Sequence, residues 1–178
     1  VNIADEADQV DVVVVVDNSR SMIPEQTNMS KRIKEFFKPL KGLDWRLGVI
    51  LTDPRNSFTE PSGVTIRGDG RLLKFANGSY WLTSSLSLNQ AKSQFTKAVI
   101  RKETKGYYKE QGILTTIRSI ERSVDPSEGQ HSIHKKFFRE KVALAVIEIS
   151  DEDETIGSGE AKNARADALI NLVKSTLG

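Results

Sequence analysis

Three oxygen-bearing side chains, spaced two residues apart, stand where they could hold a metal ion. Asp17, Ser19 and Ser21 lie in the segment VVVVVDNSRSM, directly after a run of valines. Mg²⁺ takes hard oxygen ligands at about 2.1 Å in near-octahedral array and keeps several waters. Residues two apart in a turn can converge on one point, so the spacing indicates a divalent-metal site. The competing interpretation is a strand-to-helix turn whose polar residues cap the next helix.

Acidic residues follow a second apolar segment of the chain. The sequence SDEDE at 150–154 comes directly after ALAVIEI at 143–149. A run of charges is usually a solvated surface, and we assign residues 152–154 to that role. Asp151 differs because it comes at the end of a predicted strand, where a neighbouring parallel strand would place Asp17. Asp151 is therefore predicted to contribute to the same metal site.

Strand and helix patterns alternate along the chain and explain how these residues would be positioned. Residues 10–16 are mostly β-branched and apolar without alternation, which is typical of a parallel strand buried on both faces. Further strands are predicted at 47–52 and 143–149. Apolar residues at helical spacing predict helices within 29–40, 87–99, 113–124 and 161–173. The alternation predicts a three-layer, Rossmann-like α/β fold with a mostly parallel sheet, whose ligands lie beyond the carboxyl ends of the strands.

One stretch, about 55–87, breaks this alternation. Segments 64–67 and 71–75 are predicted to pair as a hairpin around a Gly-Asp-Gly turn at 68–70, so we interpret the stretch as an inserted β-ribbon. The tripeptide Arg-Gly-Asp at 67–69 occurs in some integrin ligands, but turn geometry alone explains it here.

The composition is that of one ordinary soluble domain. The chain has 178 residues with 28% charged, and no apolar run approaches the ~20 residues that cross a bilayer. Its net charge of +2 gives no indication of a nucleic-acid or anionic-membrane surface. Without cysteine there is no thiolate zinc site or cysteine nucleophile. We expect residues 1–178 to form a single domain, and Val1 in place of Met indicates a portion of a longer chain.

Other residues that could do chemistry point away from an enzyme. No Gly-x-Gly-x-x-Gly or Gly-Lys-Ser/Thr loop follows a strand, so a nucleotide cofactor is not expected. The sequence shows no nucleophile and base pair. His131 and His134 lack acidic or cysteine neighbours in the sequence, and we expect solvated surface residues rather than metal ligands.

The chain resembles the von Willebrand factor A domain, whose metal ion-dependent adhesion site uses an Asp-x-Ser-x-Ser loop. The resemblance covers nearly the whole chain. Asp17, Ser19 and Ser21 match that loop, and Asp151 matches the aspartate after the family's fourth strand. The resemblance implies that the two serines ligate Mg²⁺, or Mn²⁺ or Ca²⁺ in its place, and that the aspartates often act through water. One open position would accept a carboxylate from a partner.

The middle metal loop departs from the family pattern. The family has a threonine shortly before a glycine such as Gly112, whereas residues 107–109 here are Tyr-Tyr-Lys. Glu110 could replace the threonine as a direct or water-mediated ligand, and Thr104 is a second candidate. Alternatively, Glu110 caps the following helix, where the helix dipole favours a negative charge.

The resemblance implies a divalent-metal-dependent adhesion or protein-binding domain rather than an enzyme. Its partner would be a protein or glycan that offers a carboxylate, with no nucleic acid and no membrane insertion. Bacterial relatives with similar loops are often extracellular, cell-surface or periplasmic, and the same location is expected here. One alternative is a Mg²⁺-dependent phosphatase of the haloacid dehalogenase kind, although Ser19 occupies the position of its second aspartate. Another is a structural domain of a larger assembly without a working metal site.

Overall fold

The computed structural model describes residues 8–56, 58, 59, 63, 65–100, 110–128, 132–151 and 159–178. A main sheet of four strands forms its centre, in the order β5-β2-β1-β6. Its strands are β1 (Gln9–Val16), β2 (Asp44–Leu51), β5 (Leu82–Thr83) and β6 (Ala143–Ile149). The helices are α1 (Ile23–Phe37), α2 (Leu88–Val99), α3 (Gly112–Val124), α4 (Ile133–Phe137) and α5 (Gly159–Thr176), with a short 3-10 helix η1 (Pro126–Glu128).

The three long strands of the sheet are parallel. β1 pairs along its length with β2 on one side and with β6 on the other, while β5 runs antiparallel to β2. Val16 at the end of β1 lies opposite both Leu51 and Ile149, the last residues of β2 and β6. The carboxyl ends of all three strands therefore meet at one edge, and the loops that follow them begin there.

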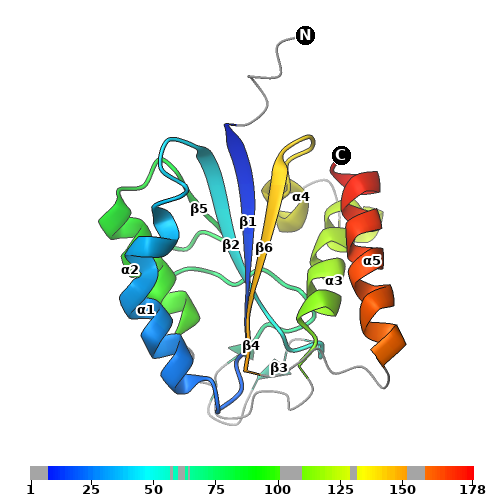
Figure 1. Ribbon diagram of the computed structural model, residues 1–178, viewed down its shortest axis with the longest axis horizontal. Helices are drawn as coiled ribbons and strands as arrows, with labels where there is room; N and C mark the ends of the chain where they lie inside the picture. Colours follow the sequence, from blue (N-terminus) through cyan, green and yellow to red (C-terminus); the bar gives the residue numbers. More distant parts are fainter. Residues whose placement is uncertain are drawn as a thin grey trace.

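Helices cover both faces of the sheet, so the molecule has three layers (Figure 1). The five valines at positions 12–16 of β1 are almost completely buried and alternate between the two faces. Val12, Val14 and Val16 join a core cluster with residues of α1 and α2, whereas Val13 and Val15 join a second cluster with residues of α3, α4 and α5. The prediction of a helix-flanked, mostly parallel α/β sheet is confirmed.

The predicted ribbon is only partly correct. The structure has a small antiparallel pair, β3 (Phe58–Thr59) with β4 (Thr65–Ile66), but residues 71–75 form no strand. Leu72 and Leu73 are instead buried against the sheet, and the Leu73 N–H donates to the Val49 carbonyl at 2.8 Å. This segment packs on the main sheet because it is too apolar to remain in an exposed hairpin.

A glycine in β2 makes that packing possible. A Cβ atom placed on Gly48 would lie 2.6 Å from Leu72 Cδ2 and 3.0 Å from Phe137 Cζ. Both side chains therefore occupy the space that any other residue would fill. The short helix α4, which carries Phe137, was not predicted from the sequence.

The helix start predicted at Ser87 is confirmed. The Ser87 hydroxyl accepts from the Gln90 N–H at 3.3 Å, and the Gln90 side chain accepts from the Ser87 N–H at 3.0 Å, which forms a capping box. Among the described residues, no helix combines the length and apolar character needed to cross a bilayer.

Candidate metal site

Asp17 lies directly after β1 and is completely buried. Its N–H donates to the Ile149 carbonyl at 3.0 Å, which continues the pairing of β1 with β6 by one residue. Oδ1 of its carboxylate accepts from the Ser19 N–H at 2.6 Å, and Oδ2 accepts from the Ser150 hydroxyl at 3.0 Å. The Gln26 side-chain amide donates to the Asp17 carbonyl at 2.8 Å. The loops after β1 and β6 thus hold this carboxylate together.

Three further oxygen atoms converge beside Asp17. The hydroxyls of Ser19 and Ser21 are 2.8 Å apart, and the Ser21 hydroxyl donates to Asp151 Oδ1 at 3.4 Å. Ser19 is half-buried, whereas Ser21 and Asp151 are exposed, so the group is open to solvent. The structure therefore brings together four of the five residues predicted for the site. That they bind a metal stays a prediction.

The spacing of these oxygens fits an octahedral cation. Neighbouring ligands of a Mg²⁺ ion with bonds of about 2.1 Å are separated by about 3.0 Å along the edge of the octahedron. The separation of 2.8 Å between the serine hydroxyls is close to this value, so Ser19 and Ser21 could be neighbouring ligands of one ion with only small movements. Asp151 Oδ1, at 3.4 Å from the Ser21 hydroxyl, is near enough to hold a water of that ion.

In the part of the chain that the structure describes, the charge of Asp17 is not balanced by a basic side chain. Within the described ranges, no lysine, arginine or histidine forms an ion pair with it. Asp53, which is equally buried just beyond β2, has Arg55 at 2.6 Å. Buried carboxylates in proteins are normally paired with a cation or coordinate a metal. The described residues therefore provide no counter-charge for the Asp17 carboxylate.

Asn18 is a feature of this loop that sequence reasoning missed. It is 1% exposed, and neither its side-chain oxygen nor its nitrogen makes a hydrogen bond within the part of the chain that the structure describes. A buried amide without partners costs roughly 1–3 kcal/mol. Such a group can hold an ordered water. The sequence signal was present, because Asn18 sits between two predicted ligands, but it suggested only a turn residue.

Glu110 lies at the same edge of the sheet but beside the neighbouring strand. It is 1% exposed, and its carboxylate accepts a hydrogen bond from the hydroxyl of Thr52, the residue after β2. The Thr52 N–H in turn donates to the Val16 carbonyl at 3.2 Å. Glu110 is thus linked to the end of β1 by way of Thr52, and no hydrogen bond to Ser19 or Ser21 is seen among the described residues. Thr104, the other candidate, lies outside the described residues.

The alternative role for Glu110, as the helix cap, is wrong. Gln111 occupies the N-cap position of α3 and makes no side-chain capping hydrogen bond. A different carboxylate lies at this helix end, because a Cβ atom on Gly112 would come 2.0 Å from Glu148 Oε1. Glu148, from β6, supplies the negative charge that the α3 N-terminus favours. Periodicity could not show this, since the contact depends on how β6 faces α3.

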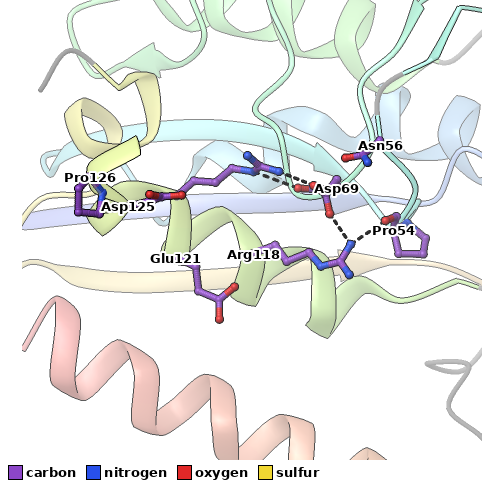
Figure 2. Close-up of a pocket in the computed structure, with 8 residues that line it drawn as sticks. Pro54, Asn56, Asp69, Arg118, Glu121, Asp125 and Pro126 are labelled. Atoms are coloured by element: carbon purple, nitrogen blue, oxygen red, sulfur yellow. Dashed lines mark hydrogen bonds and ion pairs between the residues drawn. The ribbon is translucent and has the colours of Figure 1, made fainter. Parts of the chain in front are cut away.

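The aspartate of the Arg-Gly-Asp tripeptide, Asp69, makes its contacts within the molecule (Figure 2). The Asp69 side chain is 13% exposed, and its carboxylate forms ion pairs with Arg118 and Arg122 of α3. Arg118 also donates to the Pro54 carbonyl at 2.7 Å. These contacts border a polar cavity of about 720 Å³ beside α3. They fix the turn at 68–70 to α3, so Asp69 serves packing rather than recognition.

The prediction that His134 is a solvated surface residue is wrong. This residue is 4% exposed, and its Nε2 lies 3.3 Å from both the Leu72 nitrogen and the Gly70 oxygen. Burial lowers the pKa of His134 to about 4, so the ring is neutral at pH 7. His131 lies outside the described residues.

The metal site would thus depend on serine hydroxyls. Among the described residues, no group of three or more Asp, Glu, His or Cys side chains is arranged to hold a metal. Serine oxygens complete the set at the Asp17 loop, as hard cations accept. Comparison with models of known protein families and with curated proteins gave no match. The function is therefore inferred from the geometry of this site and from the fold.

Proposed function

We propose that this chain is a von Willebrand factor A-type domain that binds a divalent cation, Mg²⁺ first of all, and uses it to bind a partner. The observation that carries the proposal is the buried carboxylate of Asp17, which has no basic partner among the described residues and lies beside the converging oxygens of Ser19, Ser21 and Asp151. The position of this group at the carboxyl ends of parallel strands supports it, because ligands bind there in open α/β sheets.

The four residues fill two roles in this proposal, the serines as direct ligands and the aspartates through water. Ser19 and Ser21 present neutral hydroxyls as direct ligands. Asp17, fixed by the Ser19 N–H and the Ser150 hydroxyl, would hold a water of the ion, and Asp151 would do the same from the loop after β6. A bound Mg²⁺ would supply an electrophilic position that accepts a carboxylate from the partner. Because the direct ligands are mostly neutral, the positive charge of the ion remains available to that carboxylate.

The proposed activity is recognition rather than catalysis. A phosphatase of the haloacid dehalogenase kind needs a second aspartate two residues after the first, and Ser19 occupies that position. The partner would be a protein or glycan with an accessible carboxylate. By its resemblance to bacterial adhesion domains, the protein is proposed to act at the cell surface or in the periplasm. Phosphate release from generic phosphoesters, lost in Asp17→Asn, would contradict this assignment.

The proposal is tested by calorimetric titration of Mg²⁺ and Mn²⁺ into EDTA-treated protein. The wild type is compared with Ser19→Ala/Ser21→Ala, and with Ser127→Ala/Ser175→Ala as a control in which two exposed serines elsewhere are changed. We expect binding in the micromolar to millimolar range that only the first double variant loses. A wild type that is folded by circular dichroism but takes up neither ion would leave a structural domain without a working metal site.

A further inference from the structure

A second candidate site lies at the opposite edge of the sheet. A cavity of about 340 Å³ opens between the end of α1, the start of β2 and the start of α2. This is the amino edge of the parallel strands, whereas the candidate metal site of Asp17, Ser19, Ser21 and Asp151 lies at their carboxyl edge (Figure 1). Pockets for small ligands have volumes of roughly 300–1,000 Å³. The cavity is large enough for a small molecule.

The inner surface of this pocket is apolar and partly aromatic. Phe37, Trp45 and Ala91 are buried and form its floor, with the Phe37 and Trp45 rings 5.4 Å apart. Leu43 and Leu86 are half-buried and contribute to its sides. Water cannot form hydrogen bonds with these groups, so an apolar ligand would gain free energy by replacing it.

The walls are held in place by backbone hydrogen bonds. On one side the Lys41 N–H donates to the Lys38 carbonyl at 3.2 Å, and Gly42 has φ of +92°, which glycine adopts without strain. On the other side the Ser84 N–H donates to the Trp45 carbonyl at 3.1 Å. The capping box of Ser87 fixes the start of α2 close by. A preformed pocket of this kind loses little entropy on binding.

The mouth of the pocket carries positive charge. Lys38 and Lys41 line it, and no aspartate or glutamate does. Lys38 is paired with Glu35 at 2.5 Å, whereas Lys41 has no ion pair within the described ranges. Leu88 at the same mouth is 48% exposed. The pocket therefore combines an apolar interior with one uncompensated cation at its opening.

We propose that this pocket binds a small amphipathic carboxylate, whose apolar body lies on Phe37 and Trp45 and whose carboxylate meets Lys41. The volume of 340 Å³ equals that of about eleven waters, which suits an apolar body of about six to eight carbons. This binding does not depend on the metal proposed for the Asp17 loop. It can therefore be measured in EDTA, and its outcome is separate from that of the metal titration.

The test uses the fluorescence of Trp45 in a Trp81→Phe variant, in which Trp45 is the sole tryptophan. Sodium octanoate is the probe, and 1-octanol is the matched molecule without charge. We expect a saturable change with octanoate, and binding of octanol about fivefold weaker because it lacks the contact with Lys41.

Two variants probe the two halves of the pocket separately. Lys41→Glu, at an exposed position, should weaken octanoate about fivefold or more and leave octanol unchanged. Ala91→Leu should fill the floor and abolish binding of both probes, provided its melting curve shows a folded protein. Lys174→Glu, an exposed lysine on α5, is the control for net charge and should bind like the parent.

Two results would overturn the proposal. Equal binding of octanoate and octanol, insensitive to Lys41→Glu, would show that the pocket does not select an anion. No saturable response to either probe in the folded parent would remove the small-molecule assignment.

Discussion

Two aspartates at opposite ends of β1 are both buried, yet their charges are balanced in different ways. Asp11 is 2% exposed and Asp17 is 0% exposed. Asp11 accepts from the Arg139 N–H at 2.7 Å and from Arg139 Nε at 2.8 Å, so an arginine neutralises it. The Asp17 carboxylate receives hydrogen bonds, among the described residues, only from neutral groups, the Ser19 N–H and the Ser150 hydroxyl.

The difference separates an edge of the sheet that an ion pair stabilises from the edge where we propose a metal site. At the amino edge, Arg139 also binds the Asp44 carboxylate at 2.6 Å and the Val10 carbonyl at 3.2 Å, so one side chain joins β1 and β2. At the carboxyl edge, the described residues supply no cation to Asp17. We propose that a bound divalent cation balances this buried charge instead.

The largest loss of stability is expected when the buried carboxylate at the amino edge, Asp11, is also deprived of a basic partner. Arg139→Ala would leave Asp11 buried without its cation, and breaking a buried pair in this way costs about 3–5 kcal/mol of unfolding free energy. Urea denaturation at pH 7 measures the loss. The double variant Asp11→Asn/Arg139→Ala should recover part of it, and a double variant no more stable than Arg139→Ala would contradict the ion-pair explanation.

His134 is a further buried titratable group, and it makes its own contribution to the pH dependence of stability. The pKa of His134 is lowered from 6.5 to about 4 by burial, so the unfolded chain takes up this proton first as the pH falls. The stability that depends on neutral His134 is complete above pH 6.5. It is lost progressively down to pH 4, by about 3 kcal/mol in all. Urea denaturation across this range should show a shallower decline for His134→Gln, and parallel curves would contradict the assignment.

The comparison predicts opposite responses to removal of the two charges. In EDTA, Asp11→Asn should destabilise the protein because Arg139 loses its partner, while Asp17→Asn should cost little or stabilise it. Mg²⁺ at 100 times its dissociation constant should then stabilise the wild type and Asp11→Asn by about 2.7 kcal/mol, but not Asp17→Asn. Thermal denaturation with and without Mg²⁺ measures both effects. An equal gain in all three proteins would sink the proposed role of Asp17.

The smallest effect concerns the hydrogen bonds that hold Asp17. Ser150→Ala removes the donor to its Oδ2, and hydrogen bonds to charged groups contribute about 1.5–3 kcal/mol. We expect a loss near the lower limit of this range in EDTA, together with Mg²⁺ affinity about tenfold weaker, because groups that orient ligands affect metal binding. Ser127→Ala, at an exposed serine outside this site, is the control and should leave the Mg²⁺ affinity unchanged.

Much of the fold follows from local patterns in the sequence. The valine run, the ALAVIEI segment and the Ser87 cap each identify an element by its own residues, and all three appear at the predicted positions. The approach of Asp151 to Ser21 also followed from the sequence, because the ends of adjacent parallel strands share an edge.

What the sequence could not show depends on contacts between distant segments. Leu72 leaves the predicted hairpin because Gly48 provides space for it. Arg139 pairs with Asp11 across 128 positions, and no local pattern indicates that contact. His134 was predicted to be a solvated surface residue because no acidic or cysteine partner was evident in the sequence, yet it is buried in α4.

The hydrogen bond between Ser21 and Asp151 joins residues 130 positions apart, so the candidate site can assemble only late in the synthesis of this segment. On the ribosome, the Asp17 loop leaves the exit tunnel long before β6 is translated. The nascent chain thus carries three of the four site residues, Asp17, Ser19 and Ser21, before Asp151 is added. The complete group forms only when β6 pairs with β1, so uptake of a divalent cation at the proposed site would report that β6 is in place.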